Sequence, residues 1–509
     1  MNGELLVCTA DCLGFAAEPC PPEQFCAGGV CSLGVCTPGD TQCASEDAYE
    51  QCDADGGGFD PPVPCADGQG CFGGECVDLC MLAEATPSSV GCSFFAARQD
   101  NYDYAAVDSV VVGNTSKTAV AKVQLYFTPD GTNAEAPLGA LKDLLPGMTL
   151  EFKMDNQPFK KVSGLRKGGV YRVQSSIPVV AYQHSPLAGQ ATNDSSMLLP
   201  EHALKQDHVI ASYRDTVGGE DRPSYFNVIA TVDGTTVQWT PPIATVAGNG
   251  VPAVAAGQTG MVVMQRFDML QVRVADDQDI SGTIVHADRP VWVLGGVNCA
   301  FIPADQYACD HCEEVLLPLD YWGKKYVGAH SPKRGNEKHY WRIYGGEDGT
   351  VVTATPPVPG SPVMVNKGQW KELVLPTATS TIFTSDRPFM PVQYLESQFG
   401  GANTGDPAMY QMIPVEQFLD RYAFVTGVGY TIHYAQVIRV MGGADVLVDG
   451  AVVGGYYAVG SYEVADWPIS EGAHFAESDT PFGIVSVGYT DVTSYAYPGG
   501  LKLAVINPQ

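Results

Sequence analysis

Short runs of alternating apolar and polar residues fill most of the chain. Between residues 270 and 274, for example, Leu and Val alternate with Gln and Arg, a period of two that predicts a strand with one buried face. Turns rich in Gly and Pro separate such runs at a spacing typical of sandwiches and related sheets. Helical patterns are few and short, and the best of them predicts a helix over residues 136–145. We therefore expect a mainly β fold.

The longest-range regularity is a segment that carries Pro and then a run of β-forming residues. It occurs at Pro178, Pro290, Pro388 and Pro481, with intervals of 112, 98 and 93 residues. Recurrence of this kind predicts a repeated architecture. The expected units cover 92–187, 198–300, 316–398 and 412–492. A row of sandwiches and a set of blades that close on one another both fit the pattern, so we predict a four-fold-repeated head that is sandwich-like or blade-like.

Two further marks repeat inside these units. The first is a Pro followed by a large apolar residue four positions later and a ring-bearing residue eight positions later, which predicts one or two helical turns leading into a strand. It is found as Pro200, Leu204 and His208, as Pro318, Trp322 and Tyr326, and as Pro414, Phe418 and Tyr422. The second is a hairpin-like stretch with Asp-Gly, found at 233–234, 348–349 and 449–450. Asp449-Gly450 lies between two Val-rich runs and strongly predicts a two-residue hairpin turn.

Composition narrows the class of protein. Hydrophobic residues make up 45% of the chain and charged residues 17%, as in a packed globular protein. The 57 acidic residues outnumber the 28 basic ones, and a surface with a formal charge of −29 repels phosphate backbones and anionic lipids. The sequence also lacks the run of about 18 apolar residues that a membrane-spanning helix needs. We expect neither nucleic-acid binding nor a transmembrane segment in this chain.

The cysteines are concentrated near the start of the chain. Thirteen of the 16 lie between Cys8 and Cys92, where the sequence has no histidine, so disulfides are favoured over zinc and an oxidising compartment is expected. One spacing of four cysteines, beginning at Cys20, recurs from Cys65. We predict a partial Cys-rich module over 1–35 and a second module over 36–80. Because the first copy lacks its earliest cysteines, we expect the natural protein to begin upstream of Met1, with its secretion signal or membrane anchor there.

Four stretches of the remaining chain carry a resemblance to a known family. They are Gly91-Cys92-Ser93-Phe94, the segment PVVAYQHSP at 178–186, Ala211-Ser212-Tyr213-Arg214, and the run from Asn298 through CDHCEEVLLP to Trp322. With them, the chain resembles the IgGFc-binding protein N-terminal domain family over residues 85–505. The resemblance implies an extracellular binding or adhesive module, often placed behind Cys-rich modules. It leaves the ligand open, because a fold does not fix a ligand.

The string CDHCEE at residues 309–314 is the most site-like sequence in the chain. Two cysteines spaced in this way beside a histidine and carboxylates can hold zinc or act as a redox pair. The candidate metal ligands are Cys309, His311, Cys312 and Glu313. In an oxidising compartment Cys299 and Cys309 are instead placed to close a loop by a disulfide, and Cys80 and Cys92 to pair likewise. We favour structural disulfides and expect no metal and no cofactor.

Histidines and tyrosines supply the other candidate residues. His184, His202 and His208 have no GxSxG, HExxH or GxxxxGK motif beside them, so we expect half-exposed histidines on strand edges rather than catalytic ones. Tyrosines cluster at 102/104, 456/457 and 495/497. A tyrosine suits contact with a protein or a glycan, and cross-strand pairing on a sheet face is the alternative.

Together these features predict a secreted or surface-anchored binding protein, in which disulfide-rich modules carry a repeated β head. We expect a non-catalytic role outside the cell or on its outer surface, with a protein or a glycan on another surface as the partner. Two alternatives stay open: a structural component of a coat, matrix or appendage, and an extracellular hydrolase with a diverged site.

Overall fold

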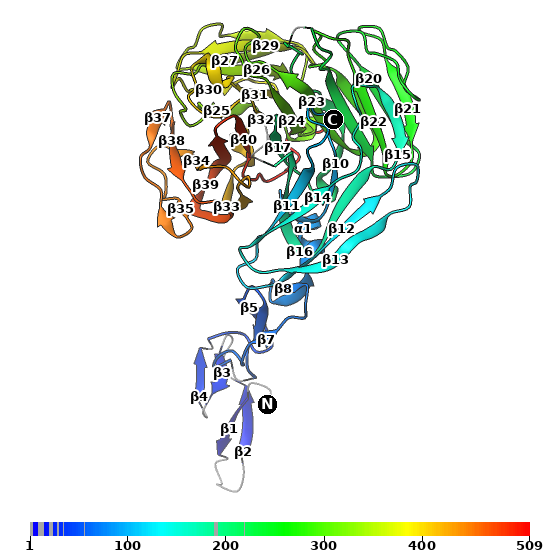
Figure 1. The fold of residues 1–509 in the computed structure, drawn as a ribbon. Helices are drawn as coiled ribbons and strands as arrows, with labels where there is room; N and C mark the ends of the chain where they lie inside the picture. Colours follow the sequence, from blue (N-terminus) through cyan, green and yellow to red (C-terminus); the bar gives the residue numbers. More distant parts are fainter. Residues whose placement is uncertain are drawn as a thin grey trace. The chain divides into compact units, whose positions relative to one another are not determined.

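The computed structural model of the chain describes residues 35–54, 56–187, 192–217 and 219–509, together with the backbone of four strands before residue 35 (Figure 1). The chain divides into two compact units, Met1–Thr86 and Pro87–Gln509, and we call the second unit the head. Both units are built mainly from antiparallel strands, and the first is rich in disulfides. The predicted fold class is confirmed.

The first unit is held together by cross-links more than by a core. Disulfides join Cys36 to Cys52, Cys43 to Cys71, and Cys65 to Cys76. Among its described hydrophobic side chains, Cys52 and Ala83 are buried. Its elements are β1 (Glu4–Cys8), β2 (Phe15–Pro19), β3 (Gln24–Ala27), β4 (Val30–Leu33), β5 (Thr41–Ser45), β6 (Ala48–Gln51), β7 (Val63–Pro64), β8 (Gln69–Phe72), β9 (Glu75–Asp78) and α1 (Leu79–Ala85). The side chains of the partial module over 1–35, apart from Val35, lie outside the described residues, so that module stays a prediction.

The head repeats one arrangement in four lobes, each containing the repeated Pro. In the first, second and fourth lobes this Pro lies inside a long strand, and in the third it directly precedes a strand of 7 residues. The four positions are Pro178 in β16, Pro290 in β23, Pro388 before β31, and Pro481 in β39.

The strands of each lobe pair as follows. The first lobe has β10 (Gly91–Ala97), β11 (Asp108–Asn114), β12 (Ala121–Thr128), β13 (Ala136–Leu144), β14 (Thr149–Met154), β16 (Val170–Ser185) and β17 (Asp194–Met197), in the order β13-β12-β16-β11-β14 with β10 and β17 also on β16. The second has β15 (Gly164–Lys167), β18 (Lys205–Val209), β19 (Ser224–Ala230), β20 (Thr235–Thr240), β21 (Gly260–Met264), β22 (Asp268–Arg273), β23 (Ile284–Ala300) and β24 (Asp310–Val315), in the order β15-β22-β19-β23-β20-β21 with β18 and β24 on β23.

The third lobe splits into two sheets, and the fourth returns to one. The third has β25 (Lys325–Gly328), β26 (His339–Gly345), β27 (Thr350–Thr355), β28 (Val363–Val365), β29 (Trp370–Leu375), β30 (Thr381–Thr384), β31 (Phe389–Leu395) and β32 (Met409–Gln411), as β25-β30-β27-β28 and β29-β26-β31-β32. The fourth has β33 (Leu419–Val425), β34 (Ile432–Val440), β35 (Leu447–Val448), β36 (Ala451–Val452), β37 (Tyr457–Val459), β38 (Tyr462–Pro468), β39 (Ala473–Thr490) and β40 (Thr493–Pro498), in the order β36-β35-β39-β34-β38-β37 with β33 and β40 on β39.

One sequence prediction is wrong in the first lobe. Residues 136–144 form the strand β13, not a helix, and pair with β12 from Ala121 opposite Leu144 to Phe127 opposite Ala136. Pro137 and Gly139 both disfavour a helix, and Gly139 adopts a φ of 72°. Pairing with a strand more distant in sequence therefore outweighs the local helical pattern.

The four lobes close on one another around a centre. In each lobe the long strand turns back into a short inner strand, and these are β17, β24, β32 and β40. The inner strand β17 contacts β24 and β40, and β32 contacts the same two strands, so the four form a ring near the middle of the head (Figure 1). Of the two arrangements that fit the sequence, the structure has blades that close on one another.

Short 3₁₀ turns lead the chain from one lobe to the next. They are η1 (Glu201–Ala203), η2 (Leu319–Tyr321) and η4 (Val415–Gln417), and a further turn, η3 (Gln398–Gly400), lies in the third lobe. The residues that directly follow η1, η2 and η4 are the buried Leu204, Trp322 and Phe418. The prediction of a helical turn leading into a strand is confirmed at all three repeats.

The two ends of the head meet at the closure of the ring. The Ser89 amide donates to the Leu501 carbonyl at 3.0 Å, and the Leu501 amide donates to Ser89 Oγ at 3.2 Å. Beyond this point the chain crosses two turns. The amides of Lys502 and Ala504 donate to the Gln417 carbonyl and side chain, and the Ile506 amide donates to the Asp320 carbonyl. The last residues thus fasten the fourth lobe to its neighbour.

A buried arginine joins the second and third lobes. Arg342 of β26 donates to the Ser212 carbonyl at 2.8 Å and pairs with Asp279 at 2.9 Å. Its guanidinium lies 4.1 Å from the ring centroid of Tyr213 and 4.0 Å from that of Trp370. Interfaces between lobes therefore contain fixed polar contacts as well as apolar packing. No helix in the described part of the chain is long and apolar enough to cross a membrane.

Candidate functional site

The string that the sequence marks as site-like lies in the inner strand β24. A disulfide joins Cys299 to Cys309 directly before this strand, so Cys309 has no thiolate to offer a metal. Successive side chains of β24 point to opposite faces, which separates His311 and Glu313 from Cys312. Within the described residues, no group of three or more His, Cys, Asp and Glu side chains is placed to hold a metal ion. Cys80 and Cys92 are each disulfide-bonded, and their mutual pairing stays a prediction.

His311 and Glu313 take part in a buried contact between the first and second lobes. His311 Nδ1 lies 2.9 Å from the Val297 carbonyl, and its Nε2 lies 3.6 Å from Glu313 Oε2. Gln183 of β16 donates to Glu313 at 3.2 Å. On the other face, Cys312 is a buried free thiol, and burial raises its pKa well above the usual value. The string therefore serves packing at the centre of the head.

The candidate catalytic histidines are buried as well. His184 Nδ1 lies 2.6 Å from Ser195 Oγ, a spacing that a nucleophile and a base would need. However, burial lowers the pKa of His184 to about 3, and both side chains are fully enclosed, so a substrate cannot reach them. Burial also lowers the pKa of His208 to about 3. The prediction of half-exposed histidines is wrong for these two residues, which are buried in the core, whereas His202 is half-buried.

One buried carboxyl joins three lobes at the centre. Asp194 Oδ2 accepts hydrogen bonds from the backbone amides of Glu313 and Met409, each at 3.0 Å. Asp194 Oδ1 accepts another from the Ser195 amide at 2.8 Å. Burial raises the pKa of this carboxyl well above its usual value. The polar residues of the inner strands thus position the lobes.

Two exposed aromatic rings and one half-buried ring lie instead on two neighbouring loops. Phe301 and Tyr307 belong to the loop that the Cys299–Cys309 disulfide closes, and Phe399 belongs to the loop after β31. The Tyr307 ring centroid lies 5.6 Å from that of Phe301 and 5.8 Å from that of Phe399. Tyr307 is 67% exposed and Phe399 is 65% exposed. We call these three residues the aromatic cluster.

Backbone contacts fix the two loops against each other. The Phe399 amide donates to the Tyr307 carbonyl at 3.1 Å, and the Ser397 amide donates to the Ile302 carbonyl at 2.7 Å. The Ile302 amide in turn donates to Ser397 Oγ at 2.9 Å. The aromatic cluster is therefore held in place before any partner arrives, which lowers the entropic cost of binding.

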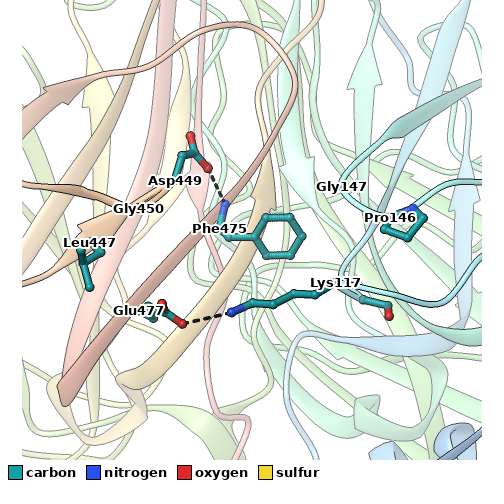
Figure 2. A pocket seen from close by; sticks show the side chains of 9 residues that line it. Lys117, Pro146, Gly147, Leu447, Asp449, Gly450, Phe475 and Glu477 are labelled. Atoms are coloured by element: carbon teal, nitrogen blue, oxygen red, sulfur yellow. Dashed lines mark hydrogen bonds and ion pairs between the residues drawn. The ribbon is translucent and has the colours of Figure 1, made fainter. Parts of the chain in front are cut away.

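A pocket opens elsewhere, between the first and fourth lobes (Figure 2). Its volume is about 320 Å³. The first lobe supplies Ser116, Lys117, Pro146 and Gly147, and the fourth supplies Leu447, Asp449, Gly450, Phe475 and Glu477. We call it the interlobe pocket. Asp449 and Gly450 form the predicted two-residue hairpin turn between β35 and β36.

The comparisons with known proteins identify the family. A model of the family described as IgGFc binding protein matches residues 194–488, from the inner strand β17 into β39. The chain belongs to this family. The resemblance predicted from the sequence is confirmed. The human IgGFc-binding protein is 31% identical over 137 residues, which is 27% of this chain and 2% of that protein. The chain thus spans a small part of the length of this family member.

A solved structure gives little further guidance. The biofilm-associated protein BSP domain covers 82% of this chain and 97% of its own, at 8% identity and a TM-score of 0.10. A score this low carries no argument about the fold.

The structure also separates the tyrosines that the sequence grouped. Tyr495 and Tyr497 stack with ring centroids 5.0 Å apart and are fully buried, so they are core residues of the head. Tyr102 is 46% exposed and stacks on Arg222, with the guanidinium 4.1 Å from the ring centroid. Sequence reasoning missed Tyr307 and Phe399. The available signal for Tyr307 was its place in a loop closed by two cysteines.

Proposed function

We propose that this protein binds another protein outside the cell, without catalysis, through the aromatic cluster. The single observation that carries the proposal is the exposure of Tyr307 and Phe399 on two loops that are already fixed against each other. Large aromatic side chains are the usual anchors of protein interfaces, and rings that need no ordering on binding contribute most.

Two further observations support the proposal. The disulfides of the first unit and of the Cys299–Cys309 loop favour an oxidising compartment. The human family member is named for binding the Fc part of IgG, so Fc is a reasonable first probe. Two of the three candidate histidines for a hydrolase, His184 and His208, are enclosed in the core.

The test is retention of protein partners by the full chain. Immobilised wild-type protein and a Tyr307→Ala/Phe399→Ala variant are compared for capture of purified Fc fragment and of serum proteins. We expect the variant to bind at least tenfold more weakly, because each ring would be an anchor. Met364→Ala, which removes another exposed apolar side chain of the third lobe (74% exposed), is the matched control and should bind as the wild type does.

Two results would count against the proposal. One is equal capture by the wild type and the double variant. The other is a chain that captures no serum protein and elutes as a large oligomer in size-exclusion chromatography, which would favour the structural role in a coat or matrix.

A further inference from the structure

The interlobe pocket is a second candidate binding site, and it lies away from the aromatic cluster. Phe475 and Glu477 are near the first residue of β39, whereas the loop that carries Phe399 meets the other end of that strand, where the Gly405 amide donates to the Thr490 carbonyl at 2.7 Å. The inference below therefore does not rest on the proposed function.

Both carboxylates of the pocket have a side-chain partner. Lys117 Nζ of the first lobe lies 3.3 Å from Glu477 Oε2 of the fourth, and this ion pair crosses the pocket (Figure 2). Asp449 Oδ2 lies 2.6 Å from Nδ1 of the buried His474, whose Nε2 lies 2.9 Å from the Ser470 carbonyl. Each charged side chain of the pocket therefore already has a partner, since Lys117 pairs with Glu477 and the Asp449 carboxylate contacts His474.

This pairing selects among classes of ligand. An anion such as a sialylated or sulfated sugar would meet the carboxylates of Asp449 and Glu477. A cation would meet the ammonium group of Lys117. A neutral ligand with both donors and acceptors meets complementary groups of each kind, since Lys117 and Ser116 can donate and the two carboxylates accept.

The apolar part of the pocket favours a flat ligand face. The half-buried Phe475 ring points toward Pro146 and Gly147 (Figure 2). Gly147 has a φ of 68°, and a Cβ at this position would lie 3.4 Å from the Phe475 ring, so a larger residue would cover the ring edge. An uncharged pyranose has one face of C–H groups and a rim of hydroxyls, which matches a half-buried aromatic ring bordered by polar groups.

We propose that the interlobe pocket binds one uncharged pyranose unit, a hexose or an N-acetylhexosamine, with its C–H face on Phe475. The hydroxyls reach Lys117, Asp449 and Glu477. A volume of about 320 Å³ holds one such ring, and the open side of the pocket lets a longer glycan continue into solvent. The same unit can come from a free sugar or from the end of a glycan chain.

The test presents sugars of different charge to the full chain. Wild-type protein is applied to an immobilised panel of neutral, sialylated and sulfated glycans, and neutral methyl glycosides are titrated in solution. We expect retention on neutral glycans. Weaker binding of the methyl glycosides than of the chains would assign the site to glycan ends, and equal binding would assign it to free sugars.

Variants locate the binding in the pocket. Phe475→Ala should bind about tenfold more weakly, since it removes the stacking face. Phe475→Trp should keep binding and report it, because the introduced indole changes its emission when a sugar covers it. Lys117→Ala removes an exposed donor and should weaken binding severalfold while the head stays folded, as its melting temperature shows. Phe72→Ala, an aromatic truncation in the first unit, is the matched control.

Three results would overturn the inference. They are no retention on any neutral glycan, unchanged binding by Phe475→Ala, and a preference for sialylated or sulfated glycans. Because the aromatic cluster is tested with protein probes and separate variants, failure here leaves the proposed function standing, and the reverse also holds.

Discussion

Reduction of the disulfides should unfold the first unit and leave the head folded. Cys36–Cys52, Cys43–Cys71 and Cys65–Cys76 close loops with sequence separations of 16, 28 and 11 residues. Loop closure of this size stabilises a fold by about 3 kcal/mol per disulfide, or roughly 9 kcal/mol for the three. A core this small rarely supplies more than about 5 kcal/mol. The reduced unit should therefore be unfolded at room temperature.

The head has other sources of stability. Its Cys299–Cys309 disulfide has a separation of 10 residues and contributes about 3 kcal/mol by the same reasoning. The head also has a hydrophobic core that reduction does not change, with large buried side chains such as Trp239, Trp292 and Trp341. Losing one or two cross-links should lower the melting temperature of the head without unfolding it.

The composition of the chain makes the two units easy to observe separately. All 6 tryptophans lie in the head, so their emission reports the head alone. The first unit contains no lysine or arginine, so trypsin does not cut it, whereas a glutamate-specific protease can cut after Glu46, Glu50 and Glu75. With increasing dithiothreitol we expect cleavage at these glutamates at concentrations that leave the tryptophan emission unchanged. An unreduced sample, which should resist the protease, is the control.

The reasoning would be refuted by either of two results. One is a red shift of tryptophan emission at the same dithiothreitol concentration that permits cleavage. The other is a first unit that resists the protease after all its disulfides are shown by mass spectrometry to be reduced.

Three further perturbations test the packing of the head. Burial raises the pKa of Asp406 from 3.8 to about 7. Between about pH 4 and pH 7 the folded state therefore holds a proton that the unfolded chain has lost. The free energy of unfolding should fall as the pH rises through that window, by at most about 4 kcal/mol for this group. In thermal unfolding between pH 4 and pH 7, Asp406→Asn should reduce the slope of the free energy of unfolding against pH by an amount equivalent to up to one proton. The exposed Asp479→Asn should leave the slope unchanged. Equal slopes for the wild type and Asp406→Asn would contradict the burial argument. Arg342→Met should lower the free energy of unfolding by about 3–5 kcal/mol in urea titrations, because it leaves buried acceptors without their donor, and a loss below about 1 kcal/mol would show that the contact between lobes is unimportant. Deletion of residues 502–509 should cost roughly 2–4 kcal/mol, because the buried Gln417 loses its partners, and an unchanged melting temperature would contradict this role of the last residues.

The sequence predicted the elements of this fold better than their assembly. Asp449-Gly450 and the Pro-centred marks at Pro200, Pro318 and Pro414 depend on local backbone preferences, and the structure has the expected turns at each. The strand β13 was mistaken for a helix because its pairing with β12 is not a local property. The closure of the lobes was left open for the same reason: contacts among inner strands join segments more than 80 residues apart.

The candidate site shows the same limit more sharply. The string at 309–314 looked reactive because cysteine, histidine and acids stand together, but alternation along a strand divides them between two faces. The interlobe pocket joins Lys117 to Glu477, which are 360 residues apart, and nothing in the neighbourhood of either residue signals the other. Sites made by the meeting of lobes were not accessible to reasoning from local spacing.

The contact between Ser89 and Leu501 joins residues that are 412 positions apart, so the order of synthesis governs when the head can mature. Until translation reaches Leu501, the fourth lobe cannot close against the first. Until then the inner strand β17, which carries the buried Asp194, also lacks its neighbour β40. A messenger RNA that ends anywhere within the fourth lobe therefore yields a chain with unpaired strand edges at the centre of the head. Cellular proteases remove products of this kind.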